Sequence, residues 1–273
     1  MSQPVYPLIF TDLDGTLLDH ESYEPVPADE MIRSFREKEI ADVIPITSKT
    51  QAELVSLVRR IPFGAVPRIS ENGSVIRVPA GCPLATGQES ETWIPGVAHA
   101  HIIEAIAALP ASLRKYLCGF SDMDVKGVAH HTGLPASDAA LAKERDASEP
   151  FLWSGSDEEM TSLSEQMRMK NIRVQRGGRF WHLTGNATKA NAMAIVLDRY
   201  QRAFPERRFV TIALGDGPND LEMIEAADYG VIIPNPAGTS VQSEVDSVIR
   251  APSPGPAGWV ASLSDILGAL GCT

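Results

Sequence analysis

Short apolar runs alternate with amphipathic helical patterns at both ends of this chain, and this alternation limits its fold more than any other feature. Near the N-terminus, the segments "VYPLIFTDLD" and "ADVIPIT" are typical of buried strands, and helical spacing follows each of them. Near the C-terminus, the runs "RFVTIALG" and "YGVIIPN" flank a further helical segment. Strands that alternate with helices predict a parallel sheet with both faces covered. We therefore expect an α/β fold with a Rossmann-like parallel core.

Local signals refine this pattern. Thr50 and Glu53 have the spacing of a capping box, and apolar residues from Leu54 to Ile61 then follow one face of a helix. A second helix is predicted over 218–227, with Pro218 at the first helical position, where proline is tolerated. These signals predict where the helices of the core begin.

The middle of the chain has a different residue pattern. It contains a long polar loop and short strand candidates, among them a hairpin around Gly177 and Gly178 in "RVQRGGRFWHLTG". The simplest architecture is an α/β core formed by residues 1–82 and 185–273, interrupted by an inserted α+β cap domain over residues 83–184.

Composition excludes several classes of partner. The chain has 273 residues and a formal net charge of −11, which argues against a nucleic-acid-binding surface and against an anionic membrane surface. No apolar stretch approaches the ~20 residues needed to span a bilayer, and the N-terminus lacks a basic leader. We expect a cytoplasmic monomer or homodimer with a small-molecule substrate. An anionic substrate would require cations placed locally in the site.

Two aspartates follow the first predicted strand, in "FTDLDGTLLD". Asp12 and Asp14 are two residues apart, so both carboxylates emerge on the same face of the strand. Ligands of open α/β sheets bind beyond the carboxyl ends of the strands. Two like charges this close are unfavourable without a cation, and Mg²⁺ suits such hard oxygen ligands. The alternative interpretation is a solvated turn with two incidental aspartates.

Two further charged features lie downstream. "GDGPND", residues 215–220, follows a predicted strand and is either a tight turn or part of a charged site, since Asp-Gly is a common turn dipeptide. Lys189 lies in the first turn of a helix predicted over 186–202, where a cation opposes the helix dipole. Such a placement is easier to explain if an anion lies opposite.

The order of these features, "DLDGT", then Lys189, then "GDGPND", resembles the haloacid dehalogenase superfamily of phosphatases. The resemblance implies that Asp12 is the nucleophile that forms an aspartyl-phosphate, and that Asp14 is the general acid and then the general base. It implies that Lys189 stabilises charge on the phosphoryl group. Covalent catalysis of this kind divides the hydrolysis into two easier displacements.

The same resemblance implies a metal site. Mg²⁺ would be bound by a carboxylate oxygen of Asp12, the backbone carbonyl of Asp14 and the carboxylate of Asp216. Asn219 and Asp220 would not bind the metal directly but would hold metal-bound water or Lys189.

The resemblance also implies a phosphoryl-binding segment after the second core strand. Thr47 is the expected hydroxyl that, with backbone N–H groups, holds phosphoryl oxygens. Ser48 beside it either contributes to this site or caps the backbone locally. Many relatives with this type of cap have Thr-Gly-Arg here, and Lys49 would replace the arginine as a substrate contact.

Other stretches resemble a narrower family, the mannosyl-3-phosphoglycerate phosphatases. They are "TSKTQAE", "ISENGSVI", "TGLPASDAALAKERDASEPFLW", "RGGRFWHLTG" and "GPAGW", and they are spread over most of the chain. Such an enzyme removes phosphate from mannosyl-3-phosphoglycerate and yields mannosylglycerate, a compatible solute. In this superfamily the cap supplies substrate specificity.

The cap offers residues that suit this substrate. Arg176 and Arg179 flank two glycines, and arginine is suited to bidentate recognition of a carboxylate, so we expect this turn to clamp the glycerate carboxylate. The alternative is a hairpin with a solvated basic tip. Trp181 and His182 are interpreted as packing residues. Glu71-Asn72 either lines the site near the domain interface or forms a plain hairpin turn.

Three other functions stay open. The chain could be a phosphatase of another sugar phosphate, such as glucosyl-3-phosphoglycerate, sucrose phosphate or trehalose phosphate. It could be a phosphosugar mutase that uses the same aspartyl-phosphate. A non-catalytic regulatory module is the third, but a module that only binds has no need for a nucleophile.

Overall fold

The central sheet is parallel, as the alternation of strands and helices predicts. The computed structural model describes residues 5–176, 180–236 and 241–272. Within these residues, five parallel strands form the sheet in the spatial order β12 (Val248–Arg250), β11 (Tyr229–Ile232), β10 (Arg208–Gly215), β1 (Val5–Thr11) and β2 (Asp42–Pro45). Leu8, Ile9 and Phe10 of β1 are all fully buried. Consecutive buried residues are typical of a parallel strand that is covered on both faces.

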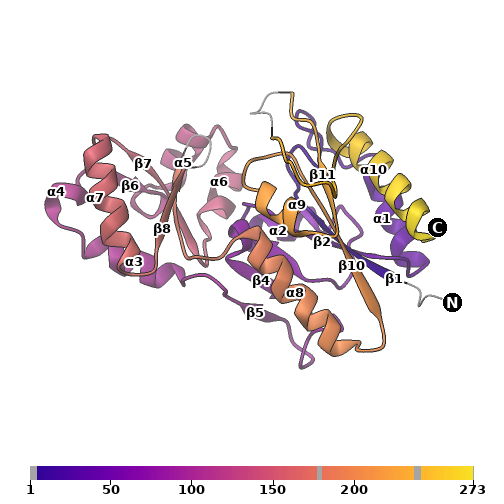
Figure 1. Cartoon of the computed structure of the whole chain (residues 1–273). Helices are drawn as coiled ribbons and strands as arrows, with labels where there is room; N and C mark the ends of the chain where they lie inside the picture. The colour runs from indigo at the N-terminus through magenta and orange to yellow at the C-terminus, as the bar shows by residue number, and fades with distance from the viewer. Residues whose placement is uncertain (1–4, 177–179, 237–240, 273) are drawn as a thin grey trace.

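Two pairs of helices enclose this sheet (Figure 1). On one face, α1 (Ala28–Glu37) packs against α10 (Gly255–Leu270). On the other face, α8 (Lys189–Ala203) packs against α9 (Leu221–Ala226). The predicted α/β class is therefore confirmed.

A small antiparallel sheet extends the core beyond β2. Its strands are β3 (Arg68–Ser70), β4 (Val75–Val78) and β5 (Glu91–Trp93). A bridge between Ile46 and Ile69 joins it to the segment after β2, and the helix α2 (Gln51–Leu57) lies between them in sequence. Because β5 pairs with β4, the chain leaves this sheet only after Trp93, inside the range 83–184 that we predict for the cap.

A separate antiparallel sheet is built from the middle of the chain. Its strands, in spatial order, are β6 (Leu117–Gly119), β7 (Ser148–Trp153), β9 (Trp181–Thr184) and β8 (Arg173–Arg176). The helices of this part are α3 (His99–Ala107), α4 (Ala111–Arg114), α5 (Val125–Thr132), α6 (Ala136–Lys143) and α7 (Asp157–Arg168). We call residues 99–184 the insert.

The insert has its own hydrophobic core. Ile102 of α3 and Leu163 of α7 pack with Phe151 and Leu183 of the sheet, and all four are fully buried. The two helices therefore cover one face of the insert sheet, and Figure 1 shows the insert as a distinct lobe beside the core. The domain boundaries themselves, 1–82 with 185–273 and 83–184, stay a prediction.

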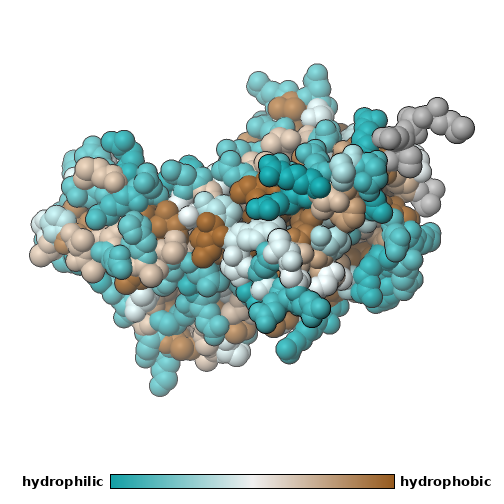
Figure 2. Space-filling view, turned by 90° about the horizontal axis from the view of Figure 1, so that it is seen from below, coloured by the Kyte–Doolittle hydropathy of each residue, from teal (hydrophilic) through white to brown (hydrophobic). Residues whose placement is uncertain are grey.

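Figure 2 shows polar residues over most of one face, with small, scattered hydrophobic patches between them. Within the residues described, no helix combines the length and the apolar character that crossing a membrane would require.

Some helix boundaries differ from the prediction. The helix α2 ends at Leu57, so Ile61 lies beyond it, although it is buried. Pro62 follows Ile61, and a proline disfavours helical backbone at the residue before it. The helix α9 begins at Leu221, so Pro218 is not its first residue. The reason lies in the carboxylate of Asp220, which accepts hydrogen bonds from N–H groups just before Pro218 and closes this segment into a turn.

Candidate active site

The first group of predicted site residues converges at the carboxyl edge of the central sheet. Asp12 follows β1, Thr47 lies just beyond β2, and Asp216 follows β10, and these three strands are neighbours in the sheet. The backbone N–H of Asp12 donates to the carbonyl of Leu214 in β10 at 2.9 Å, which fixes the start of its loop. Parallel strands end at a common edge, and this edge is where α/β proteins bind ligands.

Lys189 bridges two carboxylates at this edge. Its Nζ lies 2.6 Å from Oδ1 of Asp12 and 2.6 Å from Oδ1 of Asp220, and its side chain is buried. Burial lowers the pKa of Lys189, but the two carboxylates raise it by more, so the ammonium stays charged. Thr188 caps α8, which starts three residues later than predicted and places Lys189 at its first position. The anions expected opposite this lysine are therefore present.

Asp216 is held from both sides. Its Oδ1 accepts a hydrogen bond from the Thr16 hydroxyl at 3.3 Å, and its Oδ2 accepts one from the Asn235 amide at 2.6 Å. Gly15 packs directly against this carboxylate, since a Cβ at that position would lie 2.7 Å from Oδ2, and its φ is +77°. Only glycine adopts that backbone conformation readily, so the glycine of "DLDGT" makes room for Asp216.

The carboxylates of Asp12, Asp216 and Asp220 form a compact acidic group, with an oxygen of each within 4.8 Å of the others. Among the described residues, Lys189 is the only cation within ion-pair distance of them. Burial raises the pKa of Asp12 to about 8; Lys189 opposes this shift, and Asp220 and Asp14 add to it. Burial and Asp220 also raise the pKa of Asp216. The group is short of positive charge, and hard carboxylate oxygens with this deficit fit a divalent cation such as Mg²⁺.

Asp14 pairs with Lys49. Oδ2 of Asp14 lies 2.8 Å from Nζ of Lys49, and Oδ1 is buried with no hydrogen-bond partner among the described residues. Burial lowers the pKa of Lys49 and Asp14 raises it, with a net increase. Lys49, which we expect to contact substrate, contacts the predicted acid/base in this structure.

Thr47 and Ser48 occupy the loop after β2. Thr47 is buried, and its hydroxyl accepts a hydrogen bond from the N–H of Lys49 at 3.2 Å. Ser48 lines a cleft beside the acidic group. The two residues thus lie at the same edge of the sheet as Asp12 and Asp216.

The corner "GDGPND" combines both interpretations that its sequence allows. It is a turn, because Oδ2 of Asp220 accepts hydrogen bonds from the N–H groups of Asp216 and Gly217, at 3.2 and 2.9 Å. It also belongs to the charged site, because Oδ1 of the same side chain holds Lys189. Asn219 points elsewhere, and its amide donates to the Asn72 side chain at 3.2 Å.

A cleft of about 750 Å³ opens between the core and the insert next to this edge. The core lines it with Ser48, Asn72, Ala187, Thr188, Lys189, Pro218, Asn219 and Glu222, and the insert lines it with Arg145, Arg173, Gln175, Arg176 and His182. Four of these side chains are cationic and one is acidic. Local cations therefore give this acidic protein a cleft that suits an anionic ligand.

The pairing of β8 with β9 decides which cap residues reach the cleft. Gln175 lies opposite His182 and both line the cleft, whereas Val174 lies opposite Leu183 and packs toward the helices. Arg176 alternates to the side of Val174, where its guanidinium lies 5.4 Å from the centroid of the Trp181 ring, and it also lines the cleft.

Sequence reasoning missed Arg145, Arg173 and Gln175, and it interpreted the cleft residue His182 as packing. The two-residue period of "RVQR", counted from the apolar Val174, is the signal that points to Arg173 and Gln175. Arg179, the second predicted clamp residue, lies outside the described residues.

Comparisons with known proteins show which folds and families the chain is similar to. A family model described as haloacid dehalogenase-like hydrolase matches residues 132–252. BT1666 from Bacteroides thetaiotaomicron, described among phosphatases of this superfamily, matches with a TM-score of 0.67 and 17% identity over 100% of this chain and 97% of its own. BT4131, described as a subclass IIB sugar phosphatase, matches with a TM-score of 0.61 and 16% identity, over 98% of this chain and 100% of its own. TM0651 from Thermotoga maritima matches with a TM-score of 0.62 and 17% identity, over 97% of each chain.

These similarities define the fold. At such identities the structures show a shared fold, here the haloacid dehalogenase-like fold with an inserted lobe. The family model covers fewer than half of the residues, so it shows a similarity of residues 132–252 to the haloacid dehalogenase-like hydrolases.

Proposed function

We propose that the chain is a Mg²⁺-dependent phosphatase that hydrolyses a phosphomonoester through an aspartyl-phosphate. The observation that carries this proposal is the contact of Lys189 with both Asp12 and Asp220, together with the cationic cleft that Lys189 lines. A nucleophile, a buried cation and an acidic group together suit the transfer of a phosphoryl group.

In the first step, a carboxylate oxygen of Asp12 forms a bond to phosphorus while the bond from phosphorus to the substrate oxygen breaks. Asp14 gives its proton to the departing oxygen. Lys189 holds Oδ1 of Asp12 at 2.6 Å, which leaves Oδ2 for the attack, and its charge faces the phosphoryl oxygens. In the second step, Asp14 takes a proton from water, the water oxygen bonds to phosphorus, and the bond to Asp12 breaks to restore the carboxylate.

The metal-binding residues of this proposal are Asp12, the backbone carbonyl of Asp14 and Asp216. Mg²⁺, when bound there, supplies positive charge against the carboxylates and the phosphoryl oxygens. Thr16 and Asn235 orient the Asp216 carboxylate for this role. Both oxygens of Asp220 are already engaged, one by Lys189 and one by backbone N–H groups, so we assign it to positioning of the lysine.

The substrate we propose is mannosyl-3-phosphoglycerate, with mannosylglycerate as the product. Besides its phosphate it carries a carboxylate and a sugar. The cleft offers three cations from the insert, Arg145, Arg173 and Arg176, and these suit a second anionic group. A relative of the same fold, BT4131, is described as a sugar phosphatase, which supports the sugar part of the proposal.

A substrate panel tests this function. Phosphate release is measured from mannosyl-3-phosphoglycerate, its glucosyl epimer, sucrose phosphate and trehalose phosphate, each with and without Mg²⁺. We expect the highest kcat/KM for the mannosyl compound and no turnover after Mg²⁺ is removed. Comparable kcat/KM for trehalose or sucrose phosphate would contradict the narrow substrate, and isomer formation without phosphate release would indicate a mutase.

The variant Asp12→Asn tests the nucleophile. We expect it to lose all detectable phosphate release on every substrate of the panel while its circular dichroism spectrum stays that of the wild type, because an amide cannot form the covalent intermediate. Retained turnover in a folded Asp12→Asn protein would refute the assignment.

A further inference from the structure

The turn between β3 and β4 has a backbone that few sequences adopt. Glu71 and Asn72 have φ values of +50° and +55°, and Gly73 has +94°. Side chains other than glycine rarely adopt this left-handed region, and two in succession persist only where their surroundings hold them. The turn is therefore more than the plain hairpin that Asn-Gly indicates, and its contacts explain why.

Toward the core, the turn touches the segments that carry the proposed catalytic residues. The N–H of Glu71 donates to the carbonyl of Lys49, and the N–H of Asn72 donates to the carbonyl of Thr47, both at 2.9 Å. Gly73 packs so closely on the residue before Lys189 that a Cβ there would lie 2.2 Å from the Thr188 carbonyl oxygen.

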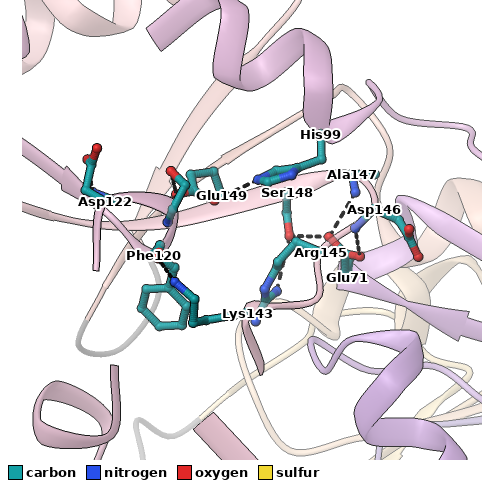
Figure 3. A network of polar contacts seen from close by, with 12 residues as sticks. Glu71, His99, Phe120, Asp122, Lys143, Arg145, Asp146, Ala147, Ser148 and Glu149 are labelled. Atoms are coloured by element: carbon teal, nitrogen blue, oxygen red, sulfur yellow. Dashed lines mark hydrogen bonds and ion pairs between the residues drawn. The ribbon is translucent and has the colours of Figure 1, made fainter. Parts of the chain in front are cut away.

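Toward the insert, the Glu71 side chain accepts hydrogen bonds from consecutive residues (Figure 3). Its Oε1 accepts from the N–H of Asp146 at 2.8 Å, and its Oε2 accepts from the N–H of Ala147 at 3.1 Å and from the Ser148 hydroxyl. The side chain is 1% exposed, although it forms no ion pair among the described residues. All three of these donors belong to the insert, at or just before the start of β7.

The same insert segment carries Arg145 into the cleft. Its Nη1 lies 3.1 Å from the Ser148 hydroxyl and 3.4 Å from the carbonyl of Ser48, and its Nε donates to the carbonyl of Ala142 at 3.0 Å. Ser148 thus contacts both Glu71 and Arg145 (Figure 3). Arg145 thus extends from the insert to the loop after β2. The phosphatase proposal assigns this loop to the substrate phosphate.

We propose that Glu71 is a positioning residue that holds residues 146–148 of the insert against the active-site edge and so fixes Arg145, which binds the substrate beyond its phosphate. This inference rests on the proposed phosphatase function. A buried carboxylate that accepts several N–H and O–H hydrogen bonds favours the arrangement that supplies them. Here that arrangement is the contact of the insert with the core.

The test compares two substrates in the variant Glu71→Gln. Mannosyl-3-phosphoglycerate reaches beyond its phosphate to the insert, whereas p-nitrophenyl phosphate has no second anionic group. Glutamine keeps the shape of the side chain but turns an NH₂ group toward the N–H donors. We expect the ratio of kcat/KM for the first substrate to that for the second to fall roughly tenfold, mainly through KM of the larger substrate.

The variant Arg145→Ala should lower the same ratio, and the double variant should be no worse than Arg145→Ala alone, because both changes act through the same contact. In addition, hydrogen exchange at the amides of Asp146 and Ala147 should accelerate in Glu71→Gln. This exchange is measured on the folded full-length protein and does not depend on activity.

Glu149→Gln is the matched control. Glu149 is as buried as Glu71 and lies on β7 next to Ser148, one of the partners of Glu71, but it accepts from His99 and Ser121 inside the insert (Figure 3). We expect it to lower the melting temperature without changing the substrate ratio. An equal loss on both substrates in Glu71→Gln, or effects that add fully in the double variant, would overturn the proposal.

Failure of the proposed substrate is distinguishable from failure of this inference. If the wild type does not hydrolyse mannosyl-3-phosphoglycerate, the substrate proposal fails, and the ratio is measured with the best anionic substrate of the panel. If Glu71→Gln does not fold, Glu71→Asp, which keeps the charge and shortens the reach, replaces it with the same expected fall. Unchanged exchange at Asp146 and Ala147 in a folded variant would refute the contact in either case.

Discussion

His182 brings a neutral imidazole into a cleft otherwise rich in cations. Burial, and then the charge of Arg145, lower its pKa from the ordinary 6.5 to about 4. At neutral pH this histidine therefore offers one N–H donor and one acceptor nitrogen, as a sugar hydroxyl requires. In the unfolded chain the same group is protonated below about pH 6.5.

This difference predicts a pH dependence of stability. Between about pH 6.5 and pH 4 the unfolded state binds a proton that the folded state excludes, so stability falls as the pH falls through this window. We expect the drop in melting temperature from pH 7 to pH 5 to be smaller in His182→Gln than in the wild type. Calorimetry at both pH values measures it. The exposed His101, replaced in the same way, is the control, and an unchanged drop in His182→Gln would count against the lowered pKa.

At the scale of secondary structure, the turn at Gly73 positions the start of α8. The close approach of Gly73 to Thr188 means that the turn and the first residue of the helix, Lys189, are placed together. A side chain at Gly73 would push against backbone rather than against a flexible side chain. The positive φ adds a second penalty for any other residue.

We expect Gly73→Ala to lower both the melting temperature and kcat, because it displaces the helix that carries Lys189. Gly81→Ala is the control: its φ of +79° carries the same backbone penalty, but a Cβ there meets nothing within 4 Å. The control should lower the free energy of unfolding by about 1 kcal/mol and leave kcat unchanged. Gly73→Ala should lower the free energy of unfolding clearly more. Urea denaturation and steady-state kinetics measure the two effects, and equal costs at both positions would contradict the packing argument.

The elements themselves could be predicted in most places. The strand β10 has the predicted bounds. Both hydrogen bonds of the capping box are present, since each side chain of the pair Thr50 and Glu53 accepts from the backbone N–H of the other. Such features depend on side chains within one or two turns of each other, so the sequence contains them. The late start of α9 could not be predicted, because it depends on the partners of the two Asp220 carboxylate oxygens. One oxygen accepts from backbone N–H groups, and the other accepts from Lys189, which is distant in sequence.

At the scale of the whole molecule, the proposed metal site joins the two ends of the core. Asp12 lies after the first strand and Asp216 after β10, with the insert between them in sequence. A ligand that binds both carboxylates in the folded state alone stabilises the entire fold.

We therefore expect Mg²⁺ at roughly one hundred times its dissociation constant to raise the melting temperature by about 5 °C. Asp216→Ala should abolish this shift, because it removes a ligand. Asp220→Ala should retain most of the shift but lose kcat, because it frees Lys189. Thermal unfolding with and without Mg²⁺, together with kinetics, separates the two roles, and equal loss of the shift in both variants would make Asp220 a metal ligand.

The sequence by itself determined the α/β class, the order of the elements and the positions of Asp12, Asp14, Lys189 and Asp216 along the chain. These follow from local periodicity and from motifs whose residues lie near one another in sequence. Only the tertiary structure decided that Glu71 contacts the insert, that Asp14 pairs with Lys49, and that Arg145 reaches the cleft. The physical reason is that these outcomes depend on which segments meet in the folded chain, and local sequence patterns do not specify contacts between side chains that are far apart in sequence.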